Sequence, residues 1–163
     1  MAFRLHNEAR SWFSEIEGEL GKGGVGVPEA PQFDMYYLCL IAGLAELEPS
    51  GEKEVTTTST TELVSAFPGE YRERGRLIIA LLLSRELRRS AVELTERDGL
   101  YKTVSQYVDH GSPSGLSSEG EKLANRYAFN GFEVVRSWFD GAKPQSLETF
   151  LLLYSAKIKA AAA

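Results

Sequence analysis

Residues 74–89 read RGRLIIALLLSRELRR, and this stretch decides the fold. Seven consecutive apolar residues, 77–83, lie between arginines on both sides. The apolar run alone would suit a buried strand, but its flanking Glu, Arg and Leu residues are good helix formers, and the whole stretch exceeds the usual length of a strand. We therefore predict a helix from about residue 70 to about residue 89, with a bent extension through Leu94 as an alternative end, and we expect its apolar centre to lie in the core.

The chain on either side of this helix also has a helical period. Apolar residues between Leu5 and Ile16 follow the i, i+3, i+4 spacing of one helix face, and residues 32–47 are apolar on nearly all sides, as expected of a central helix. Residues 48–59 are polar and predict a loop or at most a short edge strand. The predicted helices cover about residues 5–16, 32–47, 59–67, 70–89, 98–109, 117–139 and 144–159.

These segments predict an all-α fold, a compact bundle of six or seven helices. A chain of 163 residues is the length of one ordinary domain, so we predict a single helical domain over residues 1–163. The linker HGSPSGLSS at 110–118 offers a boundary between two lobes, but neither lobe would have much core alone. Gly131 stands inside the predicted helix 117–139, where glycine costs about 1 kcal/mol relative to alanine, so we expect a kink or a close contact there.

Composition and charge narrow the function classes. The formal net charge of −5 argues against binding of nucleic acid by the whole surface, though not against a local basic patch. The single cysteine, Cys39, has no intramolecular disulfide partner, which favours a reducing compartment. The first residues, MAFRLHNEARSWF, carry charge where a signal peptide is apolar, and no apolar run is long enough to span a bilayer. We expect a cytoplasmic protein that does not enter the membrane.

No pattern in the sequence gives a positive argument for an enzyme, a metal or a cofactor. GKGGVG at 21–26 lacks the preceding strand and the following Lys-Ser/Thr pair of a phosphate-binding loop, so we interpret it as a linker. Asp109 and His110, followed by Ser112 and Ser114, have the residue types of a hydrolase triad but sit together on a loop. The carboxylates show no spacing of a catalytic pair or a metal cluster. An active site assembled from distant residues stays open.

Positive charge is gathered in one segment of an otherwise acidic chain. Six arginines against two glutamates give residues 72–89 a formal charge of +4, so the rest of a chain of net charge −5 carries −9. Arginines at the ends of a buried helix often only reach solvent, and those at the C-terminal end suit the helix dipole. Alternatively, arginine in place of lysine favours bidentate recognition of phosphate or carboxylate. The candidate binding residues are Arg72, Arg74, Arg76, Arg85, Arg88 and Arg89.

The helical period places these arginines in two groups. Arg74 and Arg85 are eleven residues apart and nearly in phase, with Arg88 or Arg89 extending their line, whereas Arg72 and Arg76 fall on another side. A second candidate surface is apolar. Trp138 and Phe139 stand next to the turn DGAKP, and we expect this pair to be partly exposed at a protein interface.

Three pieces of the sequence resemble the small helical DndE-type subunit of bacterial DNA phosphorothioation systems. They are the start FRLHNEARSWF, the end AGLAEL of the second helix, and FPGEYRERGRLIIALL, which is similar to that family's Gly-Glu-Tyr segment leading into an Ala-Leu-Leu helix. The resemblance covers residues 3–85; the second helix lacks the expected basic residue, and the chain after Arg89 is additional. It implies DNA binding through basic residues of an oligomer, with Arg72, Arg74 and Arg76 as the corresponding residues.

Our leading hypothesis is a non-enzymatic helical subunit of a prokaryotic multi-protein assembly, in DNA modification or anti-phage defence. Its arginine-rich helix would contact DNA or an acidic partner. The alternative is a protein–protein interaction or regulatory module with an apolar contact surface and no nucleic-acid binding. Both hypotheses include protein partners and are compatible with self-association.

Overall fold

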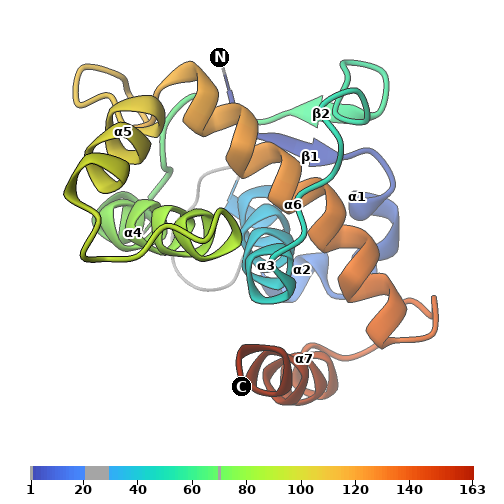
Figure 1. Ribbon diagram of the computed structural model, residues 1–163. Helices are drawn as coiled ribbons and strands as arrows, with labels where there is room; N and C mark the ends of the chain where they lie inside the picture. The colour runs from blue at the N-terminus through green and yellow to red at the C-terminus, as the bar shows by residue number, and fades with distance from the viewer. Residues whose placement is uncertain (1, 21–29, 70) are drawn as a thin grey trace.

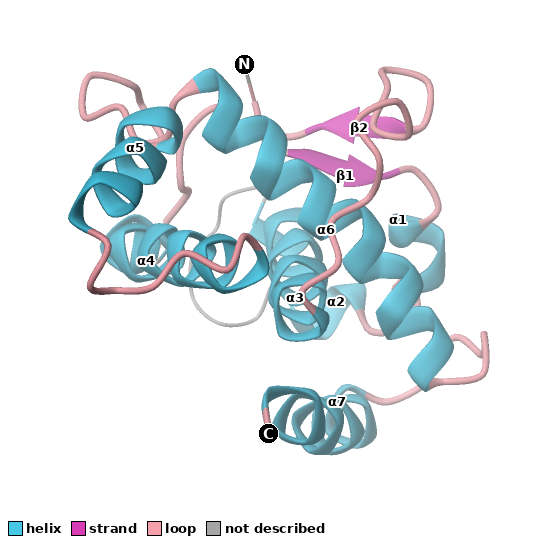
Figure 2. Cartoon of the chain, viewed as in Figure 1, coloured by secondary structure: helices cyan, strands magenta, loops and turns pink. Residues whose placement is uncertain are grey.

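Two crossing helices form the centre of the molecule. The computed structural model describes residues 2–20, 30–69 and 71–163, and its central pair is α3 (Ala30–Glu46) and α6 (Ser118–Trp138) (Figure 1). Most side chains of α3 between Phe33 and Leu44, which are both 1% exposed, are buried, and this confirms the central helix predicted at 32–47. The remaining elements surround this pair (Figure 2).

Glycines bring the backbones of α3 and α6 into direct contact. A Cβ atom added to Gly131 would lie 1.7 Å from the carbonyl oxygen of Cys39, and one added to Gly43 would lie 2.1 Å from that of Tyr127. Only a residue without a Cβ allows such an approach, so the crossing of the two helices requires glycine at both positions. The close contact expected at Gly131 is therefore confirmed.

The C-terminal helices begin at side-chain caps. The Ser117 hydroxyl accepts a hydrogen bond from the Gly120 N–H at the start of α6, and the Ser146 hydroxyl accepts one from the Thr149 N–H at the start of α7 (Leu147–Ala162). Such caps satisfy N–H groups that have no partner within the helix. Helix α7 packs on the central pair through Phe150 and Tyr154, whose hydroxyl donates to the Leu38 carbonyl at 2.6 Å.

A two-stranded antiparallel sheet is the part of the fold that the sequence did not predict. Strand β1 (Arg4–His6) pairs with β2 (Thr60–Glu62), with Leu5 opposite Thr61. The helix predicted at 5–16 is wrong in its first part, because Leu5 is the buried, inward residue of strand β1. The helix predicted at 59–67 is wrong throughout, because residues 60–62 form β2 and the rest of this range is not helical. The described chain is mostly helical, with seven helices and these two strands.

The rest of the first predicted helix is broken into two short pieces, α1 (Ala9–Trp12) and α2 (Glu17–Leu20). Its apolar residues still face one core, because Trp12, Phe13 and Ile16 are all at most 5% exposed. The spacing correctly identified the buried side chains, although the backbone between them is not a continuous helix. The predicted glycine-rich linker follows, and its GKGGVG stretch at 21–26 lies outside the described residues.

The arginine-rich stretch forms α4 (Tyr71–Arg89), and α5 (Arg97–Tyr107) follows it. The predicted extension through Leu94 is wrong, because Ala91 adopts a left-handed backbone with φ of 54° and ends the helix. The N–H of Val92 donates to the carbonyl of Leu87 at 2.9 Å, and the N–H of Ala91 donates to that of Arg88 at 3.2 Å. This pair of bonds is the Schellman motif that terminates helices.

Helix α4 is only half buried. Ile78 and Leu82 lie in the core at 5% and 1% exposure, whereas Leu77 is 71% exposed. The expectation that the whole apolar centre is core is therefore wrong for the outward face. In the described part of the chain, none of the helices combines the length and the apolar character that a membrane crossing requires.

Residues 108–117 connect α5 to α6 as a braced loop. The backbone of Val108 bridges to that of Leu116, and the Asp109 N–H donates to the Gly115 carbonyl at 3.1 Å. Leu116 is buried in the same core cluster as Phe3 and Tyr154, so side chains from both sides of this loop share one core. The loop is thereby held against the body of the protein.

Candidate functional site

The arginines of α4 project from two flanks of the helix. At about 100° per residue, Arg74 and Arg85 are about 20° apart in projection and Arg88 lies close to them, whereas Arg76 is about 160° from Arg74. Arg74, Arg85 and Arg88 therefore form what we call the open flank. Arg72 and Arg76 form the pocket flank, because both line a hollow between α4 and the α5–α6 loop.

Most of these arginines have no internal partner, in contrast to arginines elsewhere. In the described residues, no ion pair or side-chain hydrogen bond engages Arg72, Arg74, Arg76, Arg85 or Arg88. Four of the five arginines outside α4 do have a carboxylate within ion-pair distance, the exception being Arg97. In an acidic protein, where carboxylates are abundant, this leaves a concentration of unneutralised positive charge on α4.

Arg89 differs from the other five. Its guanidinium donates two hydrogen bonds, of 2.9 and 2.7 Å, to the carboxylate of Glu86, which is 4% exposed. The Tyr127 hydroxyl from α6 donates to the same carboxylate at 3.1 Å. Burial, followed by the Glu86 charge, raises the pKa of Tyr127, which stays a donor at neutral pH. Arg89 thus neutralises a buried carboxylate, and its guanidinium already has a partner within the protein.

The hollow on the pocket flank has a volume of about 410 Å³. Its polar lining includes Arg72, Arg76 and His110, and its apolar lining includes Ile79, Val108 and Pro113. These three polar residues are all exposed to solvent. Sequence reasoning treated the arginines and the 110–118 linker separately, and only the folded chain places them together.

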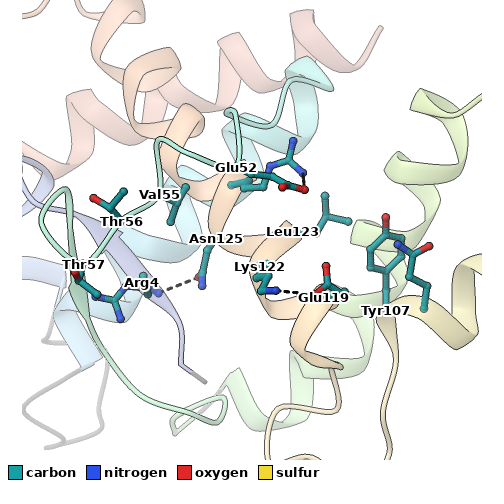
Figure 3. A pocket seen from close by; sticks show the side chains of 12 residues that line it. Arg4, Glu52, Val55, Thr56, Thr57, Tyr107, Glu119, Lys122, Leu123 and Asn125 are labelled. Atoms are coloured by element: carbon teal, nitrogen blue, oxygen red, sulfur yellow. Dashed lines mark hydrogen bonds and ion pairs between the residues drawn. The ribbon is translucent and has the colours of Figure 1, made fainter.

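A second hollow, of about 440 Å³, lies between α6, the end of α5 and residues 52–57 (Figure 3). Its cations already have anionic partners. Lys122 contacts Glu119 at 2.7 Å, Arg126 lies 3.9 Å from Glu52, and Arg4 contacts Glu62 at 2.9 Å. The charges in this hollow neutralise one another, so it is the weaker candidate for binding a charged ligand.

Asn125 lines the hollow of Figure 3, but its side chain is hydrogen-bonded to other groups of the protein. Its carbonyl oxygen accepts from the Arg4 backbone N–H at 2.9 Å and from the Tyr36 hydroxyl at 3.1 Å, and its amide donates to the Ala2 carbonyl at 3.1 Å. This side chain, 2% exposed, ties α6 to the N-terminal strand. An asparagine within an amphipathic helix gave no signal of such a role.

The residue types of a hydrolase triad are not brought into a catalytic arrangement. The Ser112 hydroxyl donates to the Leu116 carbonyl at 2.6 Å, and the Ser114 hydroxyl donates to Glu121 at 2.7 Å. The Asp109 carboxylate accepts from the Gly111 N–H at 2.9 Å. Among the described residues no hydrogen bond joins His110 to either serine, so these contacts brace the loop.

Other reactive groups are buried or dispersed. Cys39 is fully buried in α3, and burial raises the pKa of its thiol well above the usual range, which disfavours the nucleophilic thiolate. Within residues 2–20, 30–69 and 71–163, no three His, Cys, Asp or Glu side chains gather as ligands for a metal ion.

Trp138 and Phe139 are half-buried and contact other rings of the same chain. The Trp138 ring lies edge-on to Tyr154 at 5.8 Å between centroids, and Phe139 stacks on Phe150 at 5.1 Å. These contacts fasten α7 to the end of α6. A role for the pair at an interface with another protein stays a prediction.

No protein-family model, curated protein or solved structure matches this chain.

Proposed function

We propose that this chain is a non-enzymatic subunit of a prokaryotic DNA-modification or defence assembly that contacts duplex DNA through the open flank of α4. The observation that carries the proposal is the set of α4 arginines that have no ion pair among the described residues of an acidic protein. Charge pairs within a protein neutralise their own field, whereas unpaired guanidinium groups remain available to phosphates. The resemblance of residues 3–85 to DndE-type subunits also implies DNA binding, and of its corresponding arginines Arg74 lies on the open flank.

The open flank has the length to follow a DNA backbone. Arg74 and Arg88 are fourteen residues apart, which corresponds to about 21 Å along the helix axis. Phosphates of one strand succeed one another every 3.4 Å or so along the duplex axis, and because the strand winds around that axis, a straight flank of this length lies beside only some of the roughly six phosphates that this length contains. Such contacts position a protein on DNA without reading its sequence. We therefore expect binding that is sensitive to salt and indifferent to base sequence.

Fluorescence anisotropy with a labelled duplex, measured from 50 to 200 mM salt, tests the proposal. The variant replaces the three open-flank residues together: Arg74→Ala, Arg85→Ala and Arg88→Ala. Each lost phosphate contact reduces the magnitude of the slope of log K against log salt by about 0.9. The slope of the variant is therefore expected to be smaller in magnitude by up to about 2.7.

A matched control removes the same positive charge elsewhere. The variant Lys143→Ala, Lys157→Ala, Lys159→Ala takes three exposed cations from α7 and the turn before it. The slope of log K against log salt for this control is expected to differ from that of the unmodified protein by no more than about 0.9, the value of one phosphate contact. The proposal is abandoned if the unmodified protein shows no binding at 50 mM salt, or if both triple variants lose affinity equally.

A specific observation favours the alternative, an apolar protein-binding module. Leu77, Leu94 and Tyr101 are 71%, 79% and 75% exposed, and they belong to α4, α5 and the segment between these helices. The replacement of all three by serine is expected to abolish self-association if this surface pairs copies of the chain. Size-exclusion chromatography with light scattering measures that change, and an unmodified protein that is monomeric at every concentration tested rules out pairing of copies.

A further inference from the structure

The hollow on the pocket flank of α4 has a wall of fixed shape. The α5–α6 loop that forms one side is braced by the hydrogen bond from the Ser112 hydroxyl to Leu116 and by that from Ser114 to Glu121. Because its polar groups are already satisfied within the loop, the wall does not need a ligand to form. Binding sites for small molecules are usually preformed in this way.

Two glycines keep the hollow open. Gly75 lies on α4, where an added Cβ would meet the Phe67 ring at 2.7 Å. Gly115 lies on the loop with φ of +78°, where an added Cβ would meet Ile79 at 3.1 Å. Side chains at these two positions would push α4, Phe67 and the loop apart or fill the space between them.

The charge lining the hollow has one sign. Arg72, Arg76 and His110 line it, and no Asp or Glu does so among the described lining residues. Two carboxylates of the neighbouring segments are turned to other partners: Glu121 accepts from the buried Ser114 hydroxyl, and Asp109 accepts from the Gly111 N–H. Neither arginine has an ion pair within the described part of the chain. An anion entering the hollow therefore meets two unneutralised guanidinium groups.

The remaining lining is apolar and suits the rest of an organic ligand. Phe67, Ile79, Val108 and Pro113 contribute apolar surface beside the arginines. A volume of about 410 Å³ falls in the range of sites that hold small organic molecules, roughly 300–1,000 Å³. A bare phosphate ion would leave most of this space and its apolar surface unused.

We propose that this hollow binds a single 5′-phosphorylated nucleotide, with its phosphate held by Arg72 and Arg76 and its sugar and base against the apolar side. Arginine suits this role because its planar fork donates two parallel hydrogen bonds to phosphate oxygens. The choice of a nucleotide among phosphate-bearing ligands rests on the proposed function. The ligand is either a free mononucleotide or the 5′-phosphorylated end of a nucleic-acid strand, since both present the same chemical group.

Isothermal titration with deoxyadenosine monophosphate and with deoxyadenosine tests the phosphate requirement. The monophosphate is expected to bind and the nucleoside is not. Loss of a charge-assisted contact in Arg76→Gln is expected to weaken binding of the monophosphate by at least about tenfold. Arg97→Gln is the matched control, because it removes the same charge from an exposed arginine at the start of α5 that has no ion pair among the described residues and belongs to neither flank. Circular dichroism verifies that both variants keep their helices.

Oligonucleotides distinguish the two sources of the ligand. A single strand with a 5′ phosphate that binds more tightly than the monophosphate, and more tightly than the same strand with a 5′ hydroxyl, identifies a strand end. A monophosphate that binds at least as well as the phosphorylated strand identifies a free nucleotide. Either result supports the proposal.

Three results would overturn the inference: no binding of the monophosphate, equal binding of monophosphate and nucleoside, or equal weakening by Arg97→Gln and Arg76→Gln. The fate of the proposed function is separate. Monophosphate binding without duplex binding leaves the pocket intact and rejects the duplex contact. Duplex binding that depends on the open flank, without monophosphate binding, rejects the pocket alone.

Discussion

Replacing Gly131 by alanine tests whether the crossing of α3 and α6 holds the fold together. In a solvated helix this change would stabilise the protein by about 1 kcal/mol, because alanine is the better helix former. In this structure the new Cβ would stand 1.7 Å from the Cys39 carbonyl oxygen and 2.8 Å from the Gly43 nitrogen. Real Cβ atoms essentially never approach other atoms closer than 3.0 Å, so the helices must separate by more than 1 Å.

The cost of that separation exceeds the gain in helix propensity. Overpacking a well-packed core costs about 1–3 kcal/mol, and a clash between two backbones lies at the upper end because neither can rotate away. With about 1 kcal/mol recovered from helix propensity, we expect Gly131→Ala to be destabilised by about 2 kcal/mol. For a chain of this size the melting temperature would fall by about 4–8 °C.

Thermal and urea unfolding followed by circular dichroism measure this difference. Gly18→Ala is the matched control, because Gly18 also lies in a helix, α2, but an added Cβ there meets nothing within 4 Å. The control is expected to be unchanged or slightly more stable. A Gly131→Ala protein as stable as the control would refute the argument that the two backbones are in contact.

Four further predictions concern single side chains. Asn125→Ala removes the acceptor of the buried Tyr36 hydroxyl and is expected to cost about 3 kcal/mol in urea unfolding, and a loss below about 1 kcal/mol would contradict the assigned network. Ala91→Gly relieves a left-handed residue at the end of α4 and is expected to raise the unfolding free energy by about 1 kcal/mol; a loss of stability would contradict this. Burial lowers the pKa of His6 below 6.5 in the folded protein despite the nearby carboxylates, so the unfolded chain binds the proton first and stability falls as pH drops from 7 to 5. The urea midpoint should fall less over that range in His6→Gln, and an identical fall would refute the assignment. The buried Cys39 thiol, with its raised pKa, is expected to resist iodoacetamide in the native protein and to react once unfolded, as mass spectrometry would show; rapid native alkylation would contradict its burial.

Helices with strong local signals were predictable from the sequence. Helix α6 has a serine at its N-cap and apolar residues at helical spacing, and these are properties of neighbouring residues. The strands were not predictable for the opposite reason. Each has three residues, and the partner of Arg4 is Glu62, far along the chain. A strand that short has too few residues to show an alternating period.

The candidate site divides in the same way. The concentration of arginines within residues 72–89 is visible in the sequence, and so is their division into two groups, because a helix has a fixed period. The pairing of Arg89 with a buried Glu86 was not visible, since burial of Glu86 depends on α6. The presence of His110 in the hollow that Arg76 lines likewise depends on the fold, because His110 belongs to the loop after α5. Exposure of Leu77 shows that an apolar residue within an apolar run is not necessarily in the core.

The bond between the Arg4 backbone N–H and Asn125 has a consequence for how the protein is made. These residues are 121 positions apart, and at about 5–20 residues per second a ribosome adds that length in about 6–24 s. During this interval Phe3 and Leu5, each at most 3% exposed in the finished protein, have no α6 to cover them. Residues 3–5 are thus fully buried only after α6 has been synthesised, and until then this apolar segment is available to a chaperone.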